Sequence, residues 1–206
     1  MRLLELFSGT KSVSKAIGYK FTEIVSLDNM NKYKPNICVD ILEWDYKQYP
    51  SDYFNVIWAS PPCTEYSILK HNTGMKTNID SADSIVLRVF DIIDYFNPKY
   101  WFIENPYSGL LKKRDFMELL PFYDVDYCRF SEWGYKKKTR IWTNIDYKDM
   151  LCEGKDKCKN MIGRFHKVSF GGQGRPKEHI YIKCPAGDTA YRIPELLIKD
   201  LFEKIN

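Results

Sequence analysis

The chain has 206 residues, 44% of them hydrophobic and 28% charged, which is typical of a globular domain and excludes a disordered or fibrous protein. Its apolar runs are too short to span a membrane, and the start MRLLELFSG lacks the apolar core of a secretory signal. We therefore expect a protein that is not secreted, has no membrane partner and works in the cytoplasm, the nucleus or a viral factory, with its six cysteines reduced.

The net charge of +4 is distributed unevenly along the chain. Residues 129–183 hold 14 Lys and Arg against 6 Asp and Glu, a local balance of +8, so the remaining residues carry −4. Such a basic segment is typical of a face that binds a polyanion such as nucleic acid, although a solvated lysine-rich surface has the same composition.

Short apolar runs alternate with helical patterns along most of the chain. Strands are predicted over 2–7, 23–27, 36–39, 54–59 and 100–103. Helices are expected from residue 12 onward, over 81–96 and over 110–119. Two last strands, 125–130 and 139–143, are close enough to form an antiparallel pair.

This alternation predicts an α/β fold, with a doubly wound and mostly parallel sheet that ends in the antiparallel pair. The ending AYRIPELLIKDLFEKIN reads as an amphipathic helix that starts at a proline. We therefore divide the chain into a main domain (1–146), a small, irregular basic segment (147–185) and a closing helix (186–206) packed on the main domain.

Reactive or polar residues follow several predicted strands. They are Ser8 and Gly9, Asp28, Asp40, Cys63 and Glu104. Because parallel strands end at the same edge of a sheet, we expect these residues to line one rim. In ASPPCTEYS the Pro-Pro dipeptide ends the preceding strand, which places Cys63 in a stiff loop at that rim.

The residue types at this rim suggest nucleotide binding next to nucleophilic chemistry. Gly9 allows close backbone approach to a ligand, and Asp28 stands where an acidic residue binds ribose hydroxyls, although each also fits an ordinary turn. Asp40 suits the adenine or amine end of a cofactor, or a cap on the segment that follows it. Cys63 is a candidate nucleophile, and the Glu104 carboxyl could give a proton to an electrophile held between the two residues.

Four motifs together resemble those of the cytosine carbon-5 DNA methyltransferases, which use S-adenosylmethionine. They are LELFSGTKSVSKAI, SPPC, IENP and KKKTRIW, in this order, over roughly residues 3–143. The resemblance implies a Rossmann-like methyltransferase fold and transfer of a methyl group to carbon-5 of a DNA cytosine through a covalent cysteine adduct.

The resemblance also implies roles for particular residues. Cys63 would be the nucleophile, Glu104 would hold the ring nitrogen of the cytosine, and Arg140 would contact and polarise that base. Cofactor contacts would come from Phe7, Ser8, Gly9, Asp28, Asn29, Asp40, Ile41 and Pro61. Nucleic-acid contacts would come from Ser67, Lys70, Lys138, Arg140 and Arg175.

The chain departs from the family pattern in three places. Pro106 follows the Glu-Asn pair, Lys138 replaces an expected arginine, and only about 60 residues follow Thr143 where a long recognition region is usual. A reduced recognition region is compatible with relaxed specificity, a specificity subunit, or RNA or a free cytidine nucleotide as substrate. A catalytically silent nucleic-acid-binding homologue is a further alternative, which the presence of Cys63 and Glu104 argues against.

Two features lie outside this pattern. The polar stretch 64–81 has the length and composition of a lid over the rim. In the basic segment, Cys152, Cys158, His166 and Cys184 are candidate zinc ligands, although the first spacing is wider than a tight zinc knuckle and ordinary thiols are the alternative.

Overall fold

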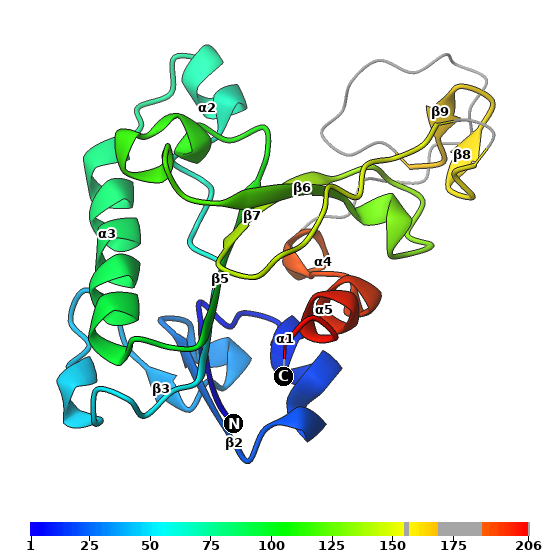
Figure 1. Cartoon of the computed structure of the whole chain (residues 1–206). Coiled ribbons are helices and arrows are strands. Elements are labelled where there is room, and N and C mark those ends of the chain that lie inside the picture. The colour runs from blue at the N-terminus through cyan, green and yellow to red at the C-terminus, as the bar shows by residue number, and fades with distance from the viewer. Residues whose placement is uncertain (155–156, 169–186, 206) are drawn as a thin grey trace.

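A seven-stranded sheet with the strand order β3-β2-β1-β4-β5-β7-β6 forms the centre of the protein (Figure 1). The structure is a computed structural model that describes residues 1–154, 157–168 and 187–205. The strands are β1 (Arg2–Leu6), β2 (Glu23–Asp28), β3 (Ile37–Cys38), β4 (Val56–Ala59), β5 (Tyr100–Pro106), β6 (Phe122–Asp126) and β7 (Lys138–Thr143). The expected doubly wound α/β fold is confirmed.

The first five strands are parallel, and β7 runs antiparallel to both of its neighbours. The predicted antiparallel pair is therefore present as the β6–β7 hairpin at one edge. In the parallel part, the chain leaves every strand at the same rim, and this rim carries the turn after β1, the end of β2 and the loop after β4.

Helices cover both faces of the sheet (Figure 1). On one face α3 (Ile79–Phe96) packs through its apolar stripe against the sheet, in a core that also includes Leu4, Ile57 and Ile103. On the other face α1 (Ser12–Ile17) and α5 (Glu195–Phe202) enclose a second core around Trp58 and Phe102. The last helix thus completes the second face of the sheet.

The ends of α3 follow from local sequence signals. The Asn78 side chain accepts a hydrogen bond from the backbone N–H of Ser81, which caps the first turn. Asn97 takes a left-handed conformation (φ 42°), and Pro98 follows it, so the helix ends there.

Three predicted elements differ from the structure. Residues 110–119 form two 3₁₀ turns, Leu111–Lys113 and Asp115–Met117, in place of a helix. The predicted strand 125–130 begins earlier, as β6, and ends at a 3₁₀ turn, Tyr127–Arg129. β6 includes Asp124 and Asp126, which look unlike strand residues in the sequence but pair with basic side chains or backbone N–H groups. The stretch 64–81 contains a short helix, α2 (Ile68–Asn72).

The described part of the C-terminal region is small. Residues 161–166 form a hairpin of β8 (Met161–Ile162) and β9 (Phe165–His166), and α4 (Asp188–Tyr191) precedes α5. Among the helices of the described residues, none has the length and apolar character needed to cross a membrane.

Candidate active site

The turn after β1 is tightly wound and forms one wall of a pocket. Phe7, Gly9 and Lys11 all have positive φ angles, of 56°, 43° and 57°. Only Gly9 takes this conformation without strain, so the turn is held by its surroundings. The buried Glu5 carboxylate accepts hydrogen bonds from the N–H groups of residues 13 and 14 at the start of α1, both at 3.2 Å, and its burial raises the pKa of Glu5.

Asp28, at the end of β2, fixes the shape of this turn. Its Oδ2 accepts a hydrogen bond from the N–H of Gly9 at 2.8 Å, and its Oδ1 accepts one from the N–H of Met30 at 2.8 Å. Each carboxylate oxygen keeps a further lone pair for another donor. The aspartate therefore shapes the binding surface and remains able to accept hydrogen bonds from a ligand.

The loop that carries Cys63 is attached to the neighbouring strand. The Asn105 side-chain amide, on β5, donates a hydrogen bond of 2.9 Å to the carbonyl of Pro61. Further along the loop, the buried Tyr66 donates from its hydroxyl to Asp83 of α3 at 2.8 Å. The IENP and SPPC motifs therefore depend on one another, since the asparagine of the first holds the proline of the second.

Glu104 lies within β5, because that strand continues to Pro106, and not at its end as predicted. Glu104 still lines the pocket, and the residue is only 7% exposed. Tyr127, which is fully buried, donates a hydrogen bond of 3.2 Å to Glu104 Oε1. This contact fixes one carboxyl oxygen of Glu104.

Two charged side chains act on the Cys63 thiol in opposite directions. Burial, together with the Glu104 carboxylate, raises the pKa of Cys63, whereas the Lys137 ammonium lowers it. Lys137 itself is buried and donates to the carbonyl of Ala190 at 3.2 Å. Burial and the Glu104 carboxylate thus favour the protonated thiol, whereas Lys137 favours the thiolate.

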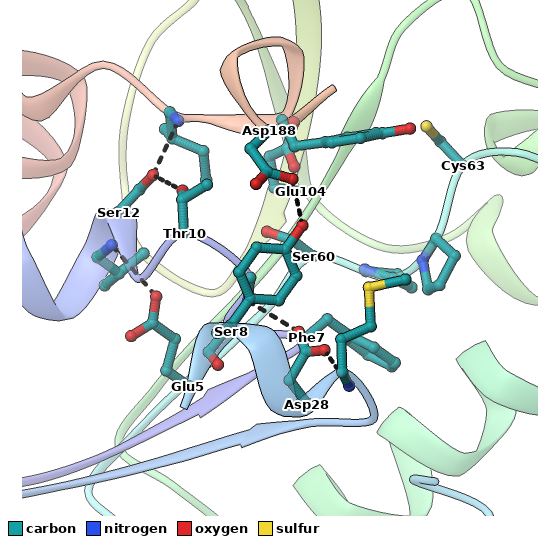
Figure 2. A pocket seen from close by; sticks show the side chains of 18 of the residues that line it. Glu5, Phe7, Ser8, Thr10, Ser12, Asp28, Ser60, Cys63, Glu104 and Asp188 are labelled. Atoms are coloured by element: carbon teal, nitrogen blue, oxygen red, sulfur yellow. Dashed lines mark hydrogen bonds between the residues drawn. The ribbon is translucent and has the colours of Figure 1, made fainter. Parts of the chain in front are cut away.

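One cavity of about 420 Å³, shown in Figure 2, is lined by the turn after β1 together with Asp28, Cys63, Glu104 and Lys137. Figure 2 shows Phe7 and Asp28 close together in one part of the cavity and Cys63 in another. The predicted residues that line it are Phe7, Ser8, Gly9, Asp28, Asn29, Pro61, Cys63 and Glu104. A nucleotide-sized ligand and a second reactant would therefore share one space.

Other predicted site residues lie elsewhere. Asp40 is exposed outside the lining, and its carboxylate accepts from the N–H of Leu42 at 2.9 Å, while Ile41 is buried in the core. Ser67 lies just before α2, and Lys70 of α2 pairs with Glu65 at 2.5 Å. Arg175 and Cys184 lie outside the described residues.

Arg140 does not face the cavity. In the β5–β7 register Glu104 is opposite Ile141, so Arg140 points to the other face of the sheet. There its guanidinium binds Asp124 at 2.8 and 3.2 Å, and Lys138 contacts the same carboxylate at 3.0 Å. Although burial opposes them, these two cations hold the pKa of Asp124 below its usual value.

Sequence reasoning missed Lys137, which lines this cavity, and Tyr127, which is outside the lining but holds the Glu104 carboxyl group. Lys137 directly precedes Lys138 in the KKKTRIW motif, and the strand register decides which of these neighbours reaches Cys63. The apolar end of the predicted strand 125–130 includes Tyr127, but nothing in the sequence distinguishes it from an ordinary core tyrosine. Both contacts depend on the hairpin register, which periodicity alone does not set.

Comparison with known proteins gives consistent matches. The profile of the C-5 cytosine-specific DNA methylase family matches residues 1–148. A protein of frog virus 3 (isolate Goorha), named "Probable DNA (cytosine-5)-methyltransferase", is 36% identical over 223 residues, covering 98% of this chain and 99% of that protein.

A solved structure of a methyltransferase shares the fold. It is a prophage-encoded E. coli protein assigned as a DNA modification methyltransferase, with a TM-score of 0.52 and 11% identity over 71% of this chain. The match spans about half of that protein's length, 49%. The Entamoeba histolytica methyltransferase EhMeth has a TM-score of 0.49 and 18% identity, over 76% of this chain and 57% of that one.

Proposed function

The chain belongs to the C-5 cytosine-specific DNA methylase family, and on that premise we propose that it methylates DNA cytosine from S-adenosylmethionine through a covalent adduct with Cys63. The observation that carries this proposal is the single cavity shared by Asp28, Cys63 and Glu104. Methyl transfer requires the cofactor and the target base to lie next to one another. The residues proposed to bind each of them line the same cavity.

We assign the cofactor to the part of the cavity around the β1 turn. The remaining lone pairs of Asp28 suit the two ribose hydroxyls of a nucleoside, and Phe7 offers an aromatic ring beside them. Ser8 is buried in the lining, and its Oγ has no hydrogen-bond partner in the described structure, so it suits a polar ligand atom. S-adenosylmethionine, when bound, supplies an electrophilic methyl group on its sulfonium.

We assign the target cytosine to the part of the cavity that holds Cys63, Glu104 and Lys137. Once the Cys63 thiol has passed its proton to the Glu104 carboxylate, the thiolate adds to carbon-6 and forms a carbon–sulfur bond. Glu104 then donates that proton to the ring nitrogen as electrons move there. Carbon-5 thereby becomes an enamine carbon that can accept a methyl group. Loss of the carbon-5 proton to solvent then restores the double bond between carbon-5 and carbon-6 and expels Cys63 as a thiolate. The ring nitrogen returns its proton to Glu104, which leaves neutral 5-methylcytosine.

Lys137 takes the place that the family resemblance gave to Arg140. Its ammonium lies in the cavity lining and favours the Cys63 thiolate. Once Glu104 has given its proton to the base, its carboxylate is negatively charged and disfavours the release of Cys63 as a thiolate. The Lys137 ammonium nearby offsets this negative charge. We therefore propose that Lys137 stabilises the nucleophile and the polarised base, and that Arg140 supports the hairpin.

We propose that the basic segment 147–185 binds the DNA backbone near this cavity. In its described part Lys159, Arg164 and Lys167 are exposed. A target base must leave the duplex to reach Cys63, at a cost of a few kcal/mol that backbone contacts offset. Binding to duplex DNA should then weaken steeply as salt rises.

The test is transfer of labelled methyl groups from S-adenosylmethionine to duplex DNA, RNA and dCMP, with nucleoside analysis of the products. We expect 5-methyldeoxycytidine in DNA from the wild-type chain and no transfer by Cys63→Ala, with cofactor binding retained. The matched control is Cys38→Ala, which removes an exposed cysteine on β3 and should leave transfer unchanged. Labelling of RNA or dCMP in place of DNA would contradict the proposed substrate.

A further inference from the structure

A second cluster of reactive side chains lies outside the cavity. It consists of Cys128, Cys152, Cys158 and His166, and we call it the Cys–His cluster. Cys128 follows β6, His166 ends β9, and the other two lie between the sheet and the β8–β9 hairpin. One ligand atom from each residue can be chosen so that all four lie within 4.8 Å of one another.

The spacing within the cluster matches a tetrahedral metal site. His166 Nε2 lies 3.6 Å from Cys152 Sγ and also 3.6 Å from Cys158 Sγ. In a tetrahedral zinc site, a sulfur and a nitrogen ligand are separated by about 3.6 Å and two sulfurs by about 3.8 Å. A single ring N–H can donate to only one sulfur, so equal approach to two of them fits a shared cation better than a hydrogen bond.

Hydrogen bonds from the folded domain hold the ligands in place. The N–H of Cys152 donates to Asp126 Oδ2 at 2.8 Å, and the preceding Met150 pairs with β6 through its backbone. The buried Asn160 side chain donates to the carbonyl of Cys128 at 2.9 Å. Supported ligands of this kind are what metal sites require beyond the ligands themselves.

We propose that the Cys–His cluster binds one zinc ion as a closed structural site. Three thiolates and one imidazole complete a tetrahedral set and leave no position for substrate, which is the pattern of structural rather than catalytic zinc. The fourth ligand is Cys128, from the sheet domain, where the sequence suggested Cys184. The ion would therefore connect the basic segment to the catalytic domain.

Such a link has a physical purpose here. A two-stranded hairpin as short as β8–β9 is not stable alone, and residues 157–168 contribute few buried side chains. Zinc binding would supply the missing stability. It would also fix the segment against the loop 129–137, since the Gly134 N–H donates to Asn160 at 3.0 Å and its carbonyl accepts from Val168 at 2.8 Å.

Metal analysis of the full chain, purified under reducing conditions and incubated with zinc, tests the site. We expect about one zinc per chain in the wild type and in Cys38→Ser, and at least a tenfold lower content in Cys128→Ser. Cys184→Ser should keep its zinc. Absence of zinc from the wild type, full retention by Cys128→Ser, or loss in Cys184→Ser would each overturn the assignment.

Cobalt substitution keeps the test decisive if Cys128→Ser does not fold. The wild-type chain loaded with cobalt should show thiolate-to-metal charge-transfer absorption with an intensity that corresponds to three sulfurs, and the intense visible bands of a tetrahedral site. Zinc should displace the cobalt and abolish both. A spectrum of octahedral cobalt, or one without thiolate absorption, would contradict the proposed ligand set.

Discussion

The parallel half of the sheet and the β6–β7 hairpin contribute differently to the cavity. In the parallel half, the ends of β1, β2 and β4 place Gly9, Asp28 and Cys63 at one rim, as their positions in the sequence suggest. In the hairpin, a register of alternating faces turns Arg140 away and leaves Lys137 in the lining. Strand ends are thus easier to infer from sequence than strand faces, because a one-residue shift reverses the face.

Glu104 stands where the two regions meet, and its substitution should have the largest effect. Glu104→Gln removes the proposed proton donor for the ring nitrogen, so we expect kcat for DNA methylation to fall by about 10²- to 10⁴-fold. It also removes a negative charge that raises the pKa of Cys63, so that pKa should fall. The pH dependence of iodoacetamide alkylation of the Cys63 peptide, followed by mass spectrometry, measures this shift.

Retained cooperative unfolding distinguishes this electrostatic effect from a simple loss of structure. A misfolded variant would expose Cys63 and also lower its raised pKa to the value of a free thiol, but it would lose cooperative unfolding. A higher pKa of Cys63 in Glu104→Gln than in the wild type would contradict the assigned electrostatics.

Lys137 and Arg140 test the hairpin register directly. Lys137→Gln should raise the pKa of Cys63, move the rise of methyl transfer to higher pH and lower kcat about tenfold or more. Arg140→Gln should leave the pKa of Cys63 unchanged and destabilise the fold by about 2 kcal/mol, since it leaves the buried Asp124 with one cation fewer.

Lys148→Gln is the matched control for this pair, because Lys148 is exposed and outside the cavity lining. Alkylation profiles and urea unfolding curves provide the two measurements. If Arg140→Gln shifted the pKa of Cys63 while Lys137→Gln did not, the register of β7 described here would be wrong.

A substitution in the parallel half of the sheet should change the affinity for the cofactor and leave the pKa of Cys63 unaltered. Asp28→Ala removes the proposed acceptor for the ribose hydroxyls, so we expect S-adenosylmethionine to bind about 10- to 100-fold more weakly. The pKa of Cys63 should stay unchanged, because Asp28 is not among the groups that shift it. Calorimetric titration measures the affinity, and an unchanged value would remove Asp28 from the cofactor site.

Much of the parallel half could be predicted because each strand is an apolar run that ends at a polar or proline residue. Val56–Ala59 followed by Pro61 and Pro62 is the clearest case, and Cys63 lies where that pattern placed it. The helix predicted over 110–119 is absent, because the apolar residues of this stretch reach the core from two 3₁₀ turns.

The hairpin could not be predicted as well because its strand residues are partly polar. Asp124 and Asp126 look unsuited to a buried strand until Arg140 and the N–H of Cys152 are brought to them by the fold. The same long-range pairing brings Cys128 to the other members of the Cys–His cluster, so sequence spacing alone suggested another fourth ligand.

The central claim is that Cys63 forms a covalent bond to the target cytosine. Duplex DNA that carries 5-fluorocytosine tests it most directly, because fluorine cannot leave carbon-5 as a proton does and the adduct persists. With S-adenosylmethionine present, the account predicts a stable protein–DNA complex whose crosslinked peptide contains Cys63. A crosslink at another cysteine, or none from a chain that methylates ordinary DNA, would contradict it.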